Sequence, residues 1–111
     1  MTRRPIPDLL PGTLDLLILR TLQTQALHGW AISERIQEVS QDVLQTNQGS
    51  LYPALHRLEH QGWIEAEWSV SERGRRAKFY QLTASGRRQL AIEASEWERM
   101  TTAIGRVMKL A

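Results

Sequence analysis

A five-residue stretch near the middle of the chain, HRLEH, has the residue types of a metal-dependent hydrolase. His56 and His60 lie four positions apart with Glu59 between them, which matches the H-x-x-E-H pattern of zinc peptidases. That pattern supplies two zinc ligands and a general base on one helical turn. Such enzymes also need a third ligand and a substrate cleft, for which a chain of 111 residues has little room. We therefore interpret the match as accidental and expect no metal site.

The sequence also lacks the residues of other kinds of catalytic site. The sequence has no glycine-rich phosphate loop and no arrangement of Ser, His and Asp, so we expect neither enzymatic activity nor a cofactor. It contains no cysteine, which excludes disulfides and thiolate metal sites and fits a cytoplasmic protein. The apolar run GTLDLLILRTL is interrupted by Asp15 and Arg20, so it is too short to span a membrane. We expect this run to form a buried helix.

Charge is concentrated in one segment of an otherwise nearly neutral chain. The net charge is only +2, from 14 Lys and Arg against 12 Asp and Glu. Residues 69–88 nevertheless hold six basic side chains and one acidic side chain, Glu72. A local basic block is typical of proteins that contact phosphate. The alternative interpretation of such a block is a solvated loop.

The segment NQGSLYPALHRLEHQG predicts a helix with one apolar face, which Gly62 is placed to end. Its apolar positions, at i, i+4 and i+7, are Leu51, Leu55 and Leu58. Pro53 is expected near the helix start, because proline is tolerated in a first turn, and this makes Asn47 or Ser50 the N-cap. The exposed start then carries short or planar hydrogen-bonding side chains and no acid. Such an end suits an anionic partner.

Two further helices are expected before this one. They follow an extended arm over residues 1–12, which has three prolines and no periodicity. The first helix is expected from Thr13 to Gln25, with Leu14 and Leu17 on its apolar face. The segment HGWAISERIQEVS predicts the second helix, which is entered through Gly29 and ends near residue 40. Its apolar positions are Ile32, Ile36 and Val39.

After residue 62 the apolar period changes from 3.6 to 2. In WIEAEW, Ile64, Ala66 and Trp68 face one way, so a half-buried strand is expected, with AKFYQL as its antiparallel partner. The segment SVSERGRR between them has a glycine at the turn, which predicts a hairpin with arginines at its tip. We interpret Trp30, Trp63 and Trp68 as core and edge residues.

The final segment predicts a long helix, from an N-cap at Thr83 to about Met108, roughly 26 residues or ~39 Å. Its apolar positions follow the 4 and 3 spacing of a heptad seam, with one threonine in the row: Leu90, Ala94, Trp97, Thr101, Ile104 and Met108. This helix is too long to be covered by so small a domain, so the seam implies a partner.

Three helices, a hairpin and a final helix is the order of a winged helix-turn-helix. We therefore predict a mainly α fold with a small β-hairpin (α+β), with a DNA-binding domain over residues 13–82 and a C-terminal dimerisation helix over residues 83–111. In that architecture the third helix enters the major groove of DNA and the hairpin, called the wing, lies against the backbone or the minor groove.

Four segments resemble the PadR family of bacterial transcriptional regulators, in its shorter form with a single C-terminal helix: GTLDLLILRTL, HGWAISERI, GSLYPALHRLEHQGWIEAEW and GRRAKFYQLTASGRRQL. The resemblance covers about residues 10–108. It implies a dimeric winged-helix repressor that responds to an aromatic or other small hydrophobic effector. It also implies that residues 47–57 read DNA, that residues 73–78 form the wing, and that the helix from Thr83 packs with the first helix as a dimer arm.

The candidate site residues fall into two sets. The expected DNA contacts are Asn47, Gln48, Ser50, Tyr52, His56, Arg57, Arg73, Arg75, Arg76 and Lys78. The expected dimer contacts are Leu14, Leu17, Leu90, Ala94, Trp97, Thr101, Ile104 and Met108.

Several of these residues have a second interpretation. Tyr52 either contacts phosphate or sugar or supports the helix as a partly buried aromatic. Arg57 either contacts DNA or pairs with Glu59 or Glu34. Trp97 either sandwiches a planar effector across the dimer axis or only anchors the interface.

The sequence thus predicts a nucleoid-associated homodimer that binds double-stranded DNA at an inverted-repeat operator and represses transcription. The alternative is a winged-helix module that binds proteins through the same seam, without specific DNA binding.

Overall fold

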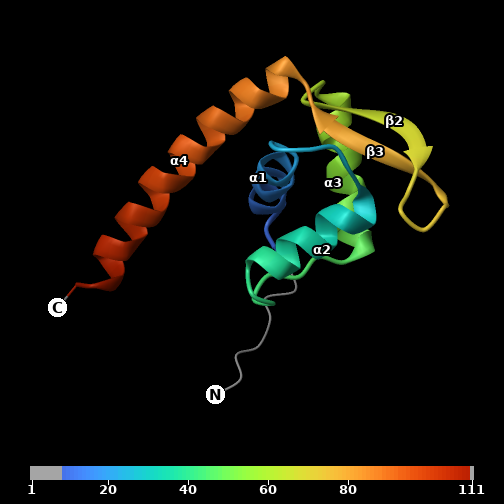
Figure 1. Cartoon of the computed structure of the whole chain (residues 1–111). Helices are drawn as coiled ribbons and strands as arrows, with labels where there is room; N and C mark the ends of the chain where they lie inside the picture. Colours follow the sequence, from blue (N-terminus) through green and yellow to red (C-terminus); the bar gives the residue numbers. More distant parts are fainter. Residues whose placement is uncertain (1–8, 111) are drawn as a thin grey trace.

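The computed structural model describes residues 9–110 and contains four helices around a small antiparallel sheet (Figure 1). The elements follow in the order α1 (Pro11–Thr21), β1 (Leu27–His28), α2 (Gly29–Val39), α3 (Gln48–His60), β2 (Ile64–Val70), β3 (Arg76–Leu82) and α4 (Ala84–Met108). The predicted fold class is therefore confirmed. No helix of the described residues is long and apolar enough to cross a membrane.

The core lies where α1, α2 and α3 meet the base of the sheet. The expected leucine face of α3 is buried, and Ala54 between those leucines is buried with them. From α1, Ile18 and Leu19 have no exposed surface, as expected for a buried helix, and Ile32 and Ile36 enter the core from α2. Val39, which was expected on the same face of α2, is exposed instead, because it lies at the last residue of the helix.

Helix α3 begins earlier than the proline suggested. Asn47 is the N-cap, with its Oδ1 atom accepting a hydrogen bond of 2.9 Å from the backbone N–H of Ser50. Pro53 therefore lies inside the helix, in its second turn, and not in the first turn as predicted. Pro53 has no backbone N–H to donate to the carbonyl of Gly49. Because Gly49 is an exposed residue at the helix start, water can replace that hydrogen bond.

Helix α1 is shifted toward the N-terminus relative to the prediction. It begins at Pro11, where the missing N–H costs nothing, and it ends at Thr21 rather than residue 25. Residues 23–25 are exposed and polar, so they have no apolar surface to bury against the core. Residues 11 and 12 of the predicted extended arm therefore belong to the helix, and residues 1–8 of that arm lie outside the described residues.

The sheet has one strand more than the predicted hairpin. β2 pairs with β3 from Ile64 opposite Leu82 to Val70 opposite Arg76. The additional strand, β1, pairs antiparallel with the other edge of β3, with Leu27 opposite Tyr80 and His28 opposite Phe79. β1 has only two residues, so it produces no alternating pattern that a sequence could reveal.

Helix α4 begins directly after β3 and projects away from the preceding part of the fold, residues 9–82, which we call the head (Figure 1). Thr83 is its N-cap, as predicted: its Oγ1 atom accepts a hydrogen bond from the N–H of Gly86 and donates one of 2.6 Å to the carbonyl of Gly62. Gly86 lies directly against the backbone of Trp63. The start of α4 is thereby fixed to the segment that links α3 to the wing.

We predict that Gly86→Ala destabilises the fold by about 1 to 3 kcal/mol, because a methyl group at this position would overlap the carbonyl of Trp63. Gly105→Ala is the matched control, since Gly105 lies in the same helix with open space around its Cα. The control should be neutral or stabilising by up to about 1 kcal/mol. Urea unfolding at one fixed protein concentration measures both values, and equal effects would contradict the close packing.

We also predict that Asn47→Ala lowers the free energy of unfolding by about 1 kcal/mol through loss of the N-cap of α3. Asn47→Asp should retain most of that stability, because the carboxylate accepts the same hydrogen bond. Gln48→Ala, one residue along and exposed, should change stability by less than about 0.5 kcal/mol. Thermal and urea unfolding test the series; a full loss in Asn47→Asp would argue against capping.

Candidate nucleic-acid interface

The face of α3 opposite the core leaves its polar side chains exposed. Gln48, Ser50 and His56 are exposed, and 46% of Tyr52 is accessible. Because the carbonyl of the Asn47 amide is held by the cap, only its amino group is free to donate elsewhere. The predicted start of the third helix is therefore accessible to a binding partner.

Arg57 is directed away from this exposed start and toward α1. Its Nη2 atom lies 2.9 Å from Oδ1 of Asp15, a residue 42 positions earlier in the chain. Burial raises the pKa of the Asp15 carboxyl, and the adjacent guanidinium opposes that rise. The expected ion-pair partners Glu59 and Glu34 were thus wrong, and the Arg57 pair instead connects α3 to α1.

Lys78 also makes an internal contact. Its Nζ atom lies 3.4 Å from Oε1 of Glu59 and 5.7 Å from the ring centre of Tyr80, so it bridges β3 and α3. Burial raises the pKa of the Tyr80 hydroxyl. Because Glu59 pairs with Lys78, one member of the HRLEH stretch is already engaged. Among residues 9–110, no group of three His, Asp or Glu side chains is placed to hold a metal ion.

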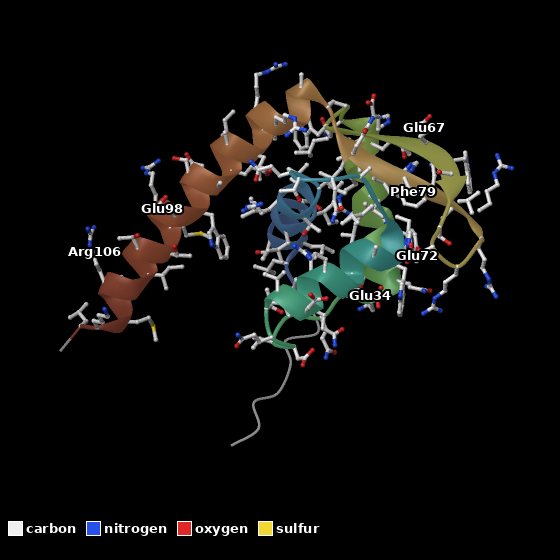
Figure 2. The ribbon with its side chains drawn as sticks, in the orientation of Figure 1. Glu34, Glu67, Glu72, Phe79, Glu98 and Arg106 are labelled. Atoms are coloured by element: carbon white, nitrogen blue, oxygen red, sulfur yellow. The ribbon has the colours of Figure 1, made fainter. Side chains whose placement is uncertain are left out.

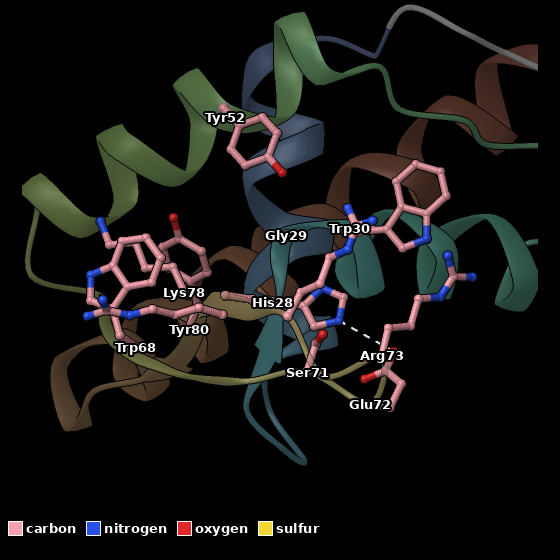
Figure 3. Close-up of a pocket in the computed structure, with 13 residues that line it drawn as sticks. His28, Gly29, Trp30, Tyr52, Trp68, Ser71, Glu72, Arg73, Lys78 and Tyr80 are labelled. Atoms are coloured by element: carbon pink, nitrogen blue, oxygen red, sulfur yellow. Dashed lines mark ion pairs between the residues drawn. The ribbon is translucent and has the colours of Figure 1, made fainter.

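A cleft of about 790 Å³ separates the wing from α2 and the start of α3 (Figure 3). Its basic side chains are Arg73, Arg75, Arg76 and Lys78, all of them predicted DNA contacts. Its aromatic rings are Trp30, Tyr52, Trp68 and Tyr80. The structure thus brings the predicted wing residues together with Tyr52, whereas Asn47, Gln48, Ser50, His56 and Arg57 are not among the residues that line the cleft.

Two tryptophans on this surface were not predicted as site residues. Trp68 is 57% exposed on the edge strand β2, and Trp30 is exposed on the first turn of α2, so neither lies in the core. Arg76 lies over the Trp68 ring at 5.0 Å, a cation–π contact between the two strands of the wing. The signal in the sequence was the mixture of aromatic and basic residues in WSVSERGRRAKFY.

Tyr52 lies against the first turn of α2, and this contact explains the glycine there. A methyl group at residue 29 would lie 3.0 Å from the Oη and Cε1 atoms of Tyr52. Gly29 therefore lets the tyrosine ring pack closely against the first turn of α2, where a larger residue would push the ring outward by a few tenths of an ångström. The interpretation of Tyr52 as a partly buried supporting aromatic fits this packing, and nearly half of its surface remains exposed.

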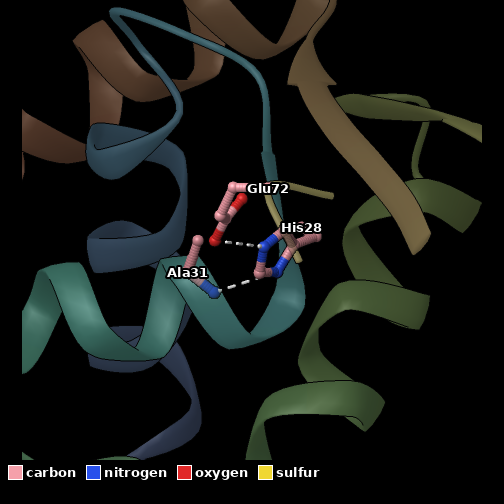
Figure 4. Close-up of polar contacts among 3 residues, drawn as sticks. All are labelled: His28, Ala31 and Glu72. Carbon is pink, nitrogen blue, oxygen red and sulfur yellow. Dashed lines mark hydrogen bonds and ion pairs between the residues drawn. The ribbon is translucent and has the colours of Figure 1, made fainter. Parts of the chain in front are cut away.

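His28 closes the inner end of the cleft, between α2 and the tip of the wing (Figure 4). It is the N-cap of α2: its Nδ1 atom accepts a hydrogen bond of 3.2 Å from the N–H of Ala31. Its Nε2 atom lies 3.6 Å from Oε1 of Glu72, and its ring packs edge-on against Phe79 at 5.3 Å. Nothing in the sequence pointed to this histidine beyond its place before a helix.

The distal half of α4 presents a row of exposed apolar side chains. Its large members are Trp97, Met100, Ile104, Val107 and Met108. Leu90, which was expected in the seam, and Leu14, which was expected among the dimer contacts, are buried in the core of one chain and do not contribute to this row. Ala94 and Thr101 are exposed and Leu17 is half-buried.

A shallow groove of about 380 Å³ runs between the start of α1 and α4. Leu10, Leu16, Trp97 and Met100 supply its apolar surface. Glu93 lies at its edge, and burial, assisted by the negative charge of Asp15, raises the pKa of this carboxyl. The groove joins the apolar row of α4 to the head.

Comparison with known proteins finds similarity to transcriptional regulators. The model of the transcriptional regulator PadR-like family matches residues 18–92. The transcriptional regulator Rv3488 of Mycobacterium tuberculosis is 36% identical over 64 residues, 58% of this chain and 59% of that protein.

Two solved structures extend the similarity to most of the chain. A transcriptional regulator from Clostridium thermocellum superimposes with a TM-score of 0.80 at 26% identity, covering 88% of this chain and 95% of that one. A PadR family transcription regulator from Clostridium difficile superimposes with a TM-score of 0.74 at 29% identity, covering 86% and 97%. The resemblance seen in the sequence is confirmed, and with it a role in DNA-binding regulation. This chain belongs to the PadR-like family of transcriptional regulators.

Proposed function

We propose that the protein is a homodimeric repressor that binds an inverted-repeat operator. The observation that carries the proposal is the exposed polar start of α3 beside a cleft with four cationic side chains. A helix start of this kind fits the major groove, and the adjacent basic cleft fits one strand of the sugar-phosphate backbone. Residues 13–82 would form the DNA-binding head and residues 83–111 the dimerisation helix of a cytoplasmic, nucleoid-associated protein.

In this proposal the site residues divide into three roles. Gln48, Ser50, His56 and the amino group of Asn47 donate to or accept from base edges in the major groove. Tyr52 and the wing arginines contact phosphate and sugar. Arg57 acts indirectly, because its ion pair with Asp15 holds α3 at a fixed position against α1.

The dimer is proposed to form along the exposed row of α4. Two-fold pairing would cover this row and would separate the two copies of α3 by about one turn of DNA or a multiple of it, roughly 10 bp between half-site centres. The groove that contains Trp97 would then lie next to the partner copy. A small hydrophobic or aromatic effector that binds there would change the angle between the heads and release the operator.

Selection from a random library of 30 bp duplexes tests the proposal, because the protein itself picks out the sequence it prefers. Fluorescence anisotropy should then show that the selected duplex binds roughly a thousandfold tighter than a scrambled duplex at the same salt concentration. Failure to enrich any sequence would contradict specific DNA binding and would favour a protein-interaction module.

We predict that replacing Arg73 and Arg75 with alanine weakens binding to selected and scrambled duplexes by the same factor. The slope of log Kd against log salt should fall by about 0.9 for each phosphate that the wing no longer neutralises. The control removes two arginines from α4, Arg99 and Arg106, and should leave the slope unchanged. A change of preferred sequence with an unaltered salt slope would show that the wing reads bases instead.

We further predict that Ile104→Asp produces a monomer whose affinity for the selected duplex falls by orders of magnitude. The residue is 50% exposed in the apolar row, so a charge there should prevent pairing without unfolding the head. Thr102→Asp puts the same charge roughly on the opposite side of α4 and should remain dimeric. Sedimentation and circular dichroism test both variants; a dimeric Ile104→Asp variant would exclude this interface.

A further inference from the structure

The inner end of the cleft contains a buried hydrogen-bond donor that is not used. His28 is only 9% exposed, and its Nδ1 atom is the acceptor for the N–H of Ala31. The ring proton of the neutral histidine is therefore on Nε2. Within residues 9–110, no hydrogen-bond partner reaches this buried Nε2 atom. An unpaired buried donor is costly, so its presence in a cleft points to a ligand that accepts from it.

Glu72 lies in front of this donor without satisfying it (Figure 4). The distance of 3.6 Å between Nε2 and Oε1 exceeds that of a hydrogen bond. A hydrogen bond from its own backbone N–H, together with His28 and Arg73, lowers the pKa of the Glu72 carboxyl, so the group is an anion at neutral pH. Glu72 is also the one acidic residue in the basic block of the sequence.

The surroundings of the carboxylate suit an oxyanion. The first turn of α2 begins at His28 and directs the positive end of its dipole to this point. Arg73 lies beside Glu72 in the wing tip (Figure 3), and Arg75 lines the same cleft. A phosphate oxygen, like a carboxylate oxygen, is anionic and accepts the same hydrogen bonds. A phosphate oxygen bound here would accept from the buried Nε2–H of His28 and would lie near Arg73 and Arg75.

We propose that His28 and Arg73 form an oxyanion subsite for a phosphate group, and that the Glu72 carboxylate occupies this subsite when no DNA is bound. The inference rests on the proposed function, because the phosphate it names belongs to the duplex held between the wing and α3. Glu72 then acts as an internal competitor: DNA binds only after the phosphate has displaced the carboxylate from His28.

The variant Glu72→Gln tests the competition. It should bind both selected and scrambled duplexes roughly tenfold more tightly than the parent, because the incoming phosphate no longer has to displace a negative charge that lies 3.6 Å from Nε2 of His28. Glu67→Gln is the matched control, since it removes one negative charge from the exposed surface of the wing strand β2 (Figure 2). Strand β3 lies between β2 and β1, the strand that carries His28. Equal gains in the two variants would overturn the proposal, because general electrostatics would then explain both.

A double-mutant cycle with His28→Asn shows whether the gain passes through the imidazole. Asparagine is a good N-cap, so α2 keeps its start while the Nε2 donor is lost. In the His28→Asn background, the gain from Glu72→Gln should fall to that of Glu67→Gln. An undiminished gain would remove His28 from the subsite.

Inorganic phosphate provides a readout that is independent of operator binding. In Glu72→Gln labelled with 15N-histidine, the His28 Nε2 resonance should shift saturably with phosphate and remain unmoved in sodium chloride of the same ionic strength. Addition of duplex to the parent should move the same resonance. If neither phosphate nor duplex moves it, the subsite does not exist, whereas a phosphate response without any duplex binding would contradict the proposed function and leave an oxyanion site.

Discussion

Helix α3 has one buried side and one exposed side, and this division determines how the other elements are arranged around it. One side carries Leu51, Leu55 and Leu58, each with at most 2% of its surface exposed, so the helix cannot rotate without exposing them. The side that faces away must then present Tyr52 and the polar residues of the first turns. The ion pair between Arg57 and Asp15 fixes the same helix against α1. A surface that reads DNA needs this rigidity, because base contacts tolerate little displacement.

The wing and α4 are both positioned from the end of α3. The chain leaves α3 at Gly62, whose carbonyl accepts from Thr83, and the backbone of Trp63 receives the N–H of Thr83 and the close approach of Gly86. A single short segment therefore connects the wing, α4 and the end of α3. A rotation of α4 would be transmitted through packed backbone to α3 and the wing, the two elements proposed to contact DNA.

Local patterns predicted most of the fold, and contacts between distant residues explain what they missed. The cap at Thr83 and the hairpin depend on neighbouring residues, which the sequence displays directly. Pro53 was placed too near the helix start, because capping by Asn47 outweighs the cost of a proline in the second turn. Arg57 pairs with a residue of α1, and His28 is buried under the wing, only when the chain is folded. No periodicity in the sequence predicts these two contacts.

In the proposed complex, the exposed start of α3 occupies the major groove while the wing cleft holds the backbone. Methylation protection and hydroxyl-radical footprinting of the parent protein on its selected duplex test this claim together. We expect protection of guanine N7 atoms, which lie in the major groove, at two symmetric half-sites, each flanked by a protected stretch of backbone. Backbone protection without any protected N7 atom, or a single asymmetric footprint, would contradict it.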